Sequence, residues 1–100
     1  MADKGLSSDA DVQTALAELP GWRREGKALV KTFDMHAFKG AVAFVAKVAD
    51  LAERADHHPD LLIQMKKVTI TLSSHDAGGI TSRDTRLARQ IEAAAKDQTA

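Results

Sequence analysis

The chain has 100 residues, of which 44% are hydrophobic and 28% charged, the composition of an ordinary globular protein. Lys plus Arg and Asp plus Glu both number 14, so the formal net charge is +0 and no global field attracts polyphosphate; we therefore expect no direct nucleic-acid partner. The absence of cysteine excludes disulfides, thiolate catalysis and cysteine-ligated zinc, and it fits a reducing compartment.

The sequence predicts neither a membrane-spanning segment nor an export signal. No apolar run approaches the length of a membrane span, and Met1–Asp11 is polar. We expect a cytoplasmic protein with one domain over residues 1–100, in which residues 1–7 are disordered.

The first predicted element is a short helix capped by Ser8 or Asp9 and stopped by Pro20-Gly21. Its apolar face comprises Val12, Ala15, Leu16 and Leu19. A hairpin follows, in which Trp22–Arg24 pairs with Ala28–Asp34 through a turn at Glu25-Gly26.

The longest predicted helix runs from His36 to Asp56 and ends before Pro59. Its apolar positions recur at helical spacing and include Phe38, Ala41, Val42, Phe44, Val45, Val48, Ala49, Leu51 and Ala52. This face is too wide for one sheet contact, so we expect part of it to meet another helix or subunit.

A second hairpin is predicted from Leu61–Met65 and Val68–Ser73, with a turn at Lys66-Lys67. A loop over Ser74–Gly79 leads to the last helix, where Thr81 and Asp84 resemble a capping box. The inward positions of that helix are Leu87, Ala88, Ile91 and Ala95, and its solvated face is expected to carry Arg83, Arg86 and Arg89.

Helix, hairpin, helix, hairpin, helix predicts an α+β fold, a four-stranded antiparallel sheet with three helices packed on one face. The second hairpin would return the end of Val68–Ser73 to the level of Pro59. That pairing brings His75 close to His57 and His58, which follow the long helix.

Three histidines in one place suggest proton transfer near neutral pH. Glu53 precedes His57 by one helical turn and is expected to fix its tautomer, while Asp84 would orient His75. Zinc is the alternative, but adjacent helical side chains diverge by about 100°, so we expect no metal.

Each motif also has a plain structural interpretation. His57-His58-Pro59 alone fits a polar helix exit, and His75-Asp76 alone fits a loop that satisfies its own backbone. His36 precedes a helix and is assigned no role.

Taken together, the motifs resemble the pterin-4a-carbinolamine dehydratase family over about Asp9 to Ile91. The resemblance rests on Glu53-x-x-x-His57-His58-Pro59, on His75-Asp76-x-Gly78-Gly79-Ile80-Thr81 and on Asp84. Flanking matches are Leu19-Pro20-Gly21-Trp22, Phe38 to Val48 and Val68-Thr69-Ile70-Thr71-Leu72.

The resemblance implies a lyase that removes water from 4a-hydroxytetrahydrobiopterin to give quinonoid dihydropterin and so recycles the cofactor of aromatic amino-acid hydroxylases. It implies a dimer or tetramer of this chain and no cofactor or metal. Catalysis would fall to His57, His58 and His75; the pterin site would be lined by Asp56, His57, His58, Ser73, Ser74, His75 and Asp76, with supporting roles for Glu53 and Asp84.

One position departs from the family pattern. Met65-Lys66 stands where members often have Tyr followed by Asn, and loss of that aromatic would remove a packing wall for the pterin ring. The alternative function is a non-catalytic partner-binding protein of the same fold, either a transcriptional coactivator or an assembly factor. A pterin binder without turnover is a third possibility.

Overall fold

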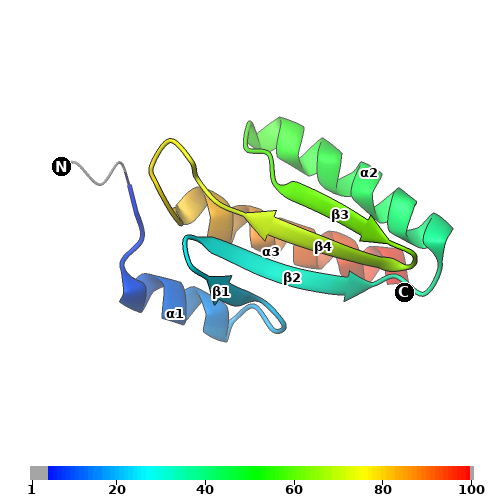
Figure 1. Cartoon of the computed structure of the whole chain (residues 1–100), viewed down its shortest axis with the longest axis horizontal. Coiled ribbons are helices and arrows are strands. Elements are labelled where there is room, and N and C mark those ends of the chain that lie inside the picture. Colours follow the sequence, from blue (N-terminus) through cyan, green and yellow to red (C-terminus); the bar gives the residue numbers. More distant parts are fainter. Residues whose placement is uncertain (1–4, 100) are drawn as a thin grey trace.

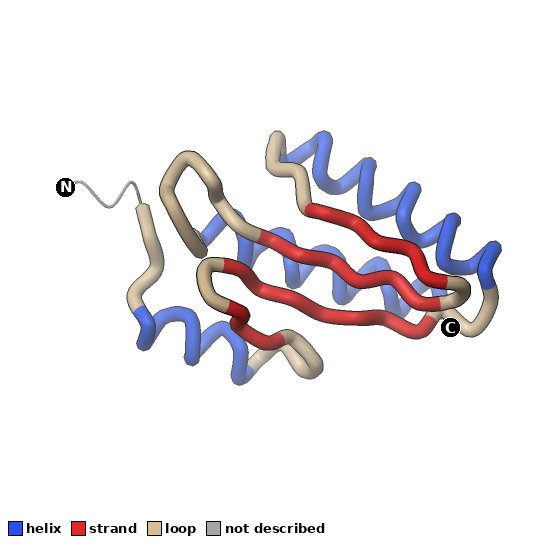
Figure 2. Tube along the Cα trace, viewed as in Figure 1, coloured by secondary structure: helices blue, strands red, loops and turns tan. Residues whose placement is uncertain are grey.

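In the computed structural model, which describes residues 5–99, a twisted sheet lies in front of one long helix, α3, and a second long helix, α2, runs along its β3 side (Figures 1 and 2). The sheet is antiparallel throughout, in the strand order β1-β2-β4-β3. The elements are α1 (Asp9–Ala17), β1 (Arg23–Glu25), β2 (Ala28–Asp34), α2 (Phe38–Ala55), β3 (Asp60–Gln64), β4 (Lys67–Leu72) and α3 (Ser82–Thr99).

The predicted fold class is confirmed. Strand β4 alternates as expected, with Val68, Ile70 and Leu72 fully buried against the helices. The same core receives Phe44 and Val48 from α2 and the apolar face of α3. Helix α1 joins this core from beside β1, and its buried residues are Val12 and Ala15.

Helix α1 begins as predicted, because the Ser8 side chain accepts a hydrogen bond from the Asp11 backbone N–H at 3.0 Å. The segment before it is partly ordered. Leu6 forms a β-bridge with Thr81, and the Ser7 N–H donates to the Ile80 carbonyl at 2.8 Å. The predicted disorder is therefore wrong for these two residues, while residues 1–4 lie outside the described part of the chain.

Both hairpin turns lie one residue away from their predicted positions. Glu25 is the last residue of β1, so the first turn is Gly26-Lys27. The second turn is Met65-Lys66, one residue earlier than predicted, with Met65 at φ 57°. In the resulting register, Asp60 lies opposite Thr71, so the end of β4 does return to the level of Pro59.

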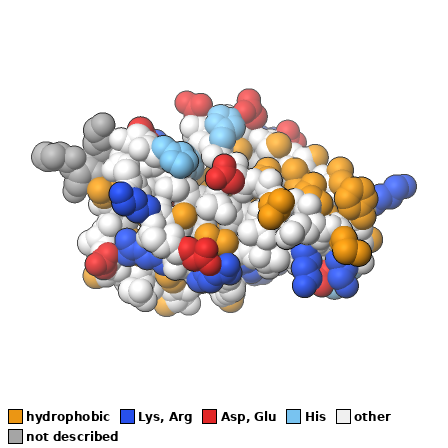
Figure 3. Space-filling model, viewed as in Figure 1, with side chains coloured by type: hydrophobic (Ala, Val, Ile, Leu, Met, Phe, Trp, Pro, Cys, Tyr) orange, Lys and Arg blue, Asp and Glu red, His pale blue; other side chains and the backbone are white. Residues whose placement is uncertain are grey.

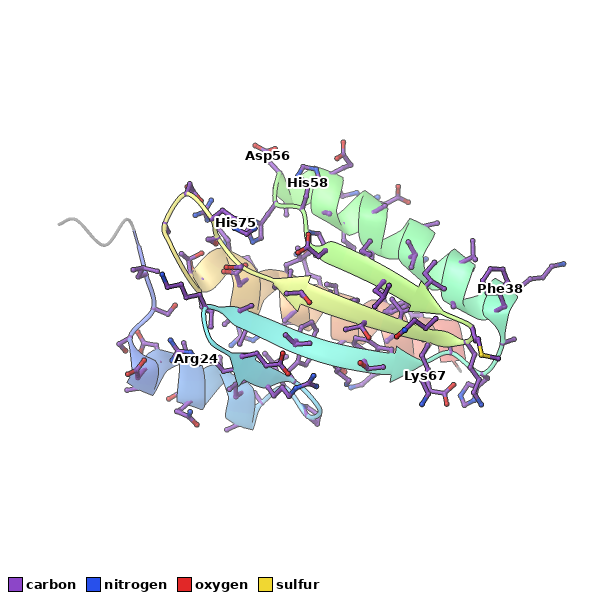
Figure 4. The ribbon with its side chains drawn as sticks, in the orientation of Figure 1. Arg24, Phe38, Asp56, His58, Lys67 and His75 are labelled. Carbon is purple, nitrogen blue, oxygen red and sulfur yellow. The ribbon has the colours of Figure 1, made fainter. Side chains whose placement is uncertain are left out.

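This register places Met65 far from His75. The turn that holds Met65 lies at the opposite end of β4 from the segment that carries His75 (Figure 4). The intervening strand of six residues spans about 20 Å at about 3.3 Å per residue. Within one chain, Met65 therefore lies too far from the segment that carries His75 to form a wall beside it.

Near Met65, several large apolar side chains are exposed. Met65 is 83% and Phe38 62% exposed, and Val42 and Leu62 are about half exposed. Figure 3 shows apolar side chains gathered at this end of the molecule. We call Phe38, Val42, Leu62 and Met65 the apolar patch; it joins α2 to β3 and agrees with the prediction that α2 is apolar over more than its sheet-facing side.

None of the helices within the described residues is both long and apolar enough to cross a bilayer.

Candidate active site

The site begins where α2 ends. The helix stops at Ala55, because Asp56 adopts the left-handed conformation with φ 50°, which aspartate tolerates better than most residues. The predicted helix was one residue longer here. Its N-terminus also differs, because His36 at φ 70° precedes the helix and Phe38 begins it. Because the chain leaves the helix at Asp56, the two histidines that follow do not continue the helical spacing of α2.

His57 is turned inward. Its backbone N–H donates to the Ala52 carbonyl at 3.1 Å, and the residue is only 8% exposed. Its ring Nε2 lies 2.5 Å from Oδ1 of Asp84 in the first turn of α3. This contact corrects two predictions, since Glu53 was expected to hold His57 and Asp84 was expected to hold His75.

Asp84 is completely buried, and all of its partners are polar groups of the protein. Its Oδ2 accepts hydrogen bonds from the Ser74 hydroxyl and the Thr81 backbone N–H, both at 2.9 Å. The bond from Thr81 is one half of the predicted capping box. These hydrogen bonds, together with the position of Asp84 in the first turn of α3, fix the orientation of its carboxyl group.

The bonding of Asp84 assigns the tautomer of neutral His57. An ionised carboxylate only accepts, so Nε2 of His57 must carry the hydrogen and donate it. The second ring nitrogen, Nδ1, is then the basic atom. A histidine with one nitrogen held by a buried carboxylate is oriented for proton transfer at the other nitrogen.

His58 turns outward and pairs with a different carboxylate. Its Nε2 lies 2.5 Å from Oε2 of Glu53, with side-chain exposures of 59% and 75%. Glu53 therefore supports His58 rather than His57. The reversal of the chain at Asp56 explains the exchange, since the predicted one-turn spacing between Glu53 and His57 assumed a continuous helix.

The third histidine lies in the loop between β4 and α3. His75 is exposed, and its side chain forms no hydrogen bond with the described residues. Figure 4 places His75 and His58 on the same side and at the same end of the molecule, with Asp56 beside them. Because Ser74 precedes His75 and bonds to Asp84, the chain Ser74–Asp84–His57 joins the two histidine-bearing segments.

Three contacts hold the loop that carries His75 in place. The Ser73 hydroxyl donates to the Lys27 carbonyl at 2.7 Å, and Ser74 pairs with Gly79 in a β-bridge. Asp76 accepts a hydrogen bond from Nη2 of Arg83 at 2.9 Å, which holds the pKa of Asp76 below its usual range. Ser74 is buried, with its hydroxyl bonded to Thr81 and Asp84, whereas Asp56 and Asp76 are exposed.

Two structural roles of Arg83 were not predicted from the sequence. Arg83, expected on the solvated face, is only half exposed and bonds to the loop through Asp76. It also helps to line a cavity of about 230 Å³ between α2 and α3, which reaches one side of His57 but not His58 or His75. The only sequence signal for Arg83 was its position directly before Asp84.

Among the described residues, no three histidine or carboxylate side chains are grouped closely enough to hold a metal ion.

The fold and this site define a small α+β domain with a buried histidine–carboxylate pair suited to acid–base chemistry. The family model for pterin 4 alpha carbinolamine dehydratase matches residues 6–94. The chain therefore belongs to the pterin-4a-carbinolamine dehydratase family, as the resemblance in the sequence predicted.

Curated relatives agree with this assignment. A protein from Roseiflexus castenholzii is 51% identical over 87 residues, which is 87% of this chain and 94% of the relative. A protein from Nocardia farcinica is 50% identical over 91 residues, or 91% of this chain and 96% of the relative. Both are provisionally named pterin-4-alpha-carbinolamine dehydratases.

Solved structures extend the comparison. The crystal structure of a transcriptional coactivator/pterin dehydratase from Brucella melitensis has a TM-score of 0.85 and 32% identity, and covers 89% of this chain and 97% of its own. A pterin dehydratase-like RuBisCO assembly factor of the alpha-carboxysome has a TM-score of 0.64 and 28% identity, covering 75% and 89%. The fold is therefore shared by proteins to which different roles are ascribed.

Proposed function

We propose that this protein removes water from 4a-hydroxytetrahydrobiopterin to give quinonoid dihydropterin, and so takes part in recycling a pterin cofactor. The observation that carries the proposal is the buried bond between His57 and Asp84. Burying a carboxylate is costly unless it is fully bonded, and here that cost is offset in a way that also orients one imidazole.

In the proposed reaction, the C4a–O bond breaks and the hydroxyl leaves as water after it gains a proton. N5 loses its proton, and its electron pair forms the N5=C4a double bond. One histidine acts as the acid and another as the base, and we assign these roles to His57, through Nδ1, and to His75. His58, supported by Glu53, orients the pterin ring or assists as base.

The remaining predicted pterin-lining residues fall into two groups. The exposed carboxylates of Asp56 and Asp76 lie on the two segments that we expect to flank the substrate. Ser74 acts from behind by holding Asp84, and Ser73 fixes the loop through its bond to Lys27. No metal or organic cofactor takes part in this proposal.

The dehydratase assay on the purified chain tests the proposal. We expect His57→Ala and His75→Ala each to slow decay of the 4a-hydroxy intermediate by about 10² to 10⁴ relative to the wild-type enzyme. Because the uncatalysed reaction proceeds on its own, a slow background rate remains. His36→Asn is the matched control, since His36 has a positive φ that Asn adopts readily and lies at the far end of β2. Wild-type rates in both alanine variants would exclude the mechanism.

A second candidate function is a non-catalytic role in binding a protein partner. The apolar patch favours it, because exposed Phe38 and Met65 side chains together with Val42 and Leu62 are typical of interaction surfaces. The same patch is where we expect this chain to form its dimer or tetramer. If the protein is a dehydratase, we expect it to act together with an aromatic amino-acid hydroxylase, whose pterin cofactor it would recycle.

Calorimetry with dihydrobiopterin, followed by the turnover assay, separates these candidates. Binding with turnover supports the dehydratase. Binding without turnover identifies a pterin-binding protein, and absence of binding favours the partner-binding role.

A further inference from the structure

A groove between the two long helices lies apart from the exposed histidines. It is the cavity of about 230 Å³ lined by Leu51, Arg54, Ala55, His57, Arg83, Arg86, Leu87 and Gln90, and we call it the α2–α3 groove. Its residues come only from α2, α3 and the turn after α2. In Figure 1, α3 lies behind the sheet and α2 runs along the β3 side, and the two helices contact each other.

The residues that line this groove carry positive charges and no negative ones. Three of its eight lining residues are arginines and none is a carboxylate, although the chain as a whole has a formal charge of +0. Arg83 is partly neutralised by Asp76. Arg54 and Arg86 form no ion pair with any described residue. Two unpaired guanidinium groups at one cavity create a local positive potential.

The surroundings of these arginines strengthen that potential. Leu51, Ala55 and Leu87 supply apolar walls, which lower the local dielectric constant. The Gln90 amide adds a further hydrogen-bond donor. Along the helices the groove continues into a region with mixed charge, which includes Lys47, Asp50 and Asp97. The basic end beside His57 is therefore distinct in charge from the rest of the groove.

We propose that the α2–α3 groove binds the phosphoryl group of a small soluble metabolite. A volume of about 230 Å³ is below the range of about 300–1,000 Å³ that is usual for drug-sized ligands, so it suits a compact group. A phosphate monoester presents three terminal oxygens, which matches three guanidinium groups from two helices better than the two oxygens of a carboxylate do. The remainder of the metabolite would extend along the mixed-charge region.

The position of His57 links this site to the buried network. His57 is one of the residues that line the groove, and its Nε2 bonds to Asp84. The proposal does not depend on the dehydratase activity, because the arginines and the cavity carry it alone.

The experiment is a titration of the full ¹⁵N-labelled chain with inorganic phosphate, with chloride at equal ionic strength as the reference. We expect saturable shifts in amide signals of residues 51–57 and 83–90. In the double variant Arg54→Gln with Arg86→Gln, the affinity should fall about tenfold or more. Arg89→Gln is the matched control, because Arg89 lies on α3 but faces Glu18 outside the groove, and its affinity should equal that of the wild type.

Three results would overturn the proposal. These are shifts that are the same in chloride, an unchanged affinity in the double variant, or binding of acetate as tight as that of phosphate. A second experiment asks whether the phosphoryl group belongs to a soluble metabolite or to a lipid, with glycerol 3-phosphate and phosphatidic acid vesicles as the two probes. Saturable binding of glycerol 3-phosphate is expected. Sedimentation with vesicles and no binding of the soluble ester would contradict a metabolite ligand. The dehydratase assay on the double variant without phosphate should give the wild-type rate, which keeps the two proposals separable.

Discussion

His57 and His58 are adjacent in the sequence and form the same kind of bond, yet their surroundings differ completely. Each places Nε2 2.5 Å from a carboxylate oxygen. The partner of His57 is wholly buried, whereas the partner of His58 is 75% exposed. An exposed pair gains little because water and salt screen it, while a buried carboxylate that loses its partners incurs the full desolvation cost. The two pairs should therefore respond very differently to the same substitutions.

The largest difference is expected in catalysis. Asp84→Asn keeps the shape of the side chain but removes its charge, and its amide can donate to Nε2 of His57 and move the ring hydrogen to Nδ1. That is the wrong tautomer for proton transfer at Nδ1, so we expect kcat/KM to fall by about 10² or more. Glu53→Gln, the matching change in the exposed pair, should lower it by less than about tenfold. Steady-state dehydratase kinetics measure both, and equal losses would contradict the comparison.

Loss of the buried carboxylate should also lower the free energy of unfolding more than loss of the exposed one. Asp84→Ala leaves His57, the Ser74 hydroxyl and the Thr81 N–H buried without their partner, which should cost about 3 kcal/mol in the free energy of unfolding. Glu53→Ala should change it by about 0.5 kcal/mol or less. Urea denaturation of both variants provides the test. A loss for Glu53→Ala as large as that for Asp84→Ala would refute the role assigned to burial.

A smaller effect is expected from the ion pair that holds the loop of His75. The Arg83 guanidinium lowers the pKa of Asp76 from its ordinary value of 3.8. Because the folded pKa is the lower one, this contribution to stability is present above about pH 4 and is lost as the pH falls through the folded value. The stability gap between wild type and Asp76→Asn should therefore close in acid. Unfolding curves at several pH values measure this gap, and a gap that is independent of pH would be inconsistent with the ion pair.

No effect on the site is expected from the far end of the hairpin. Met65→Tyr restores the residue that is frequent in the family, but the side chain lies about 20 Å from the end of β4 that leads to His75. The KM for the pterin should therefore equal that of the wild type. A lower KM in this variant would show that Met65 reaches the substrate, for example from a second copy of the chain.

The sequence predicted the elements of the fold well because their signals are local. Alternation along Val68–Leu72 and helical spacing from Phe38 onward were sufficient to place β4 and α2. Two of the three errors of one residue, those at the second hairpin turn and at the end of α2, fall where Met65 and Asp56 adopt positive φ. Neither residue is glycine, so no residue type in the sequence marked these two positions as left-handed.

The sequence predicted that the three histidines lie at one end of the molecule, but it did not predict which carboxylate each histidine contacts. His57, His58 and His75 come to one end of the molecule because strand pairing determines that, and pairing follows from the hairpin. Which carboxylate serves which histidine depends on the turn at Asp56 and on the packing of α3 against α2. Such tertiary contacts leave no periodic pattern, which is also why Arg83 was assigned to solvent.

The most direct test of the central claim is a long-range ¹H–¹⁵N spectrum of the histidine rings at neutral pH, recorded before and after addition of 7,8-dihydrobiopterin. We predict that His57 carries its hydrogen on Nε2 in the free protein and that its Nδ1 signal shifts when the pterin binds. A His57 ring protonated only on Nδ1, or a Nδ1 signal that stays unchanged at saturating pterin, would contradict the account.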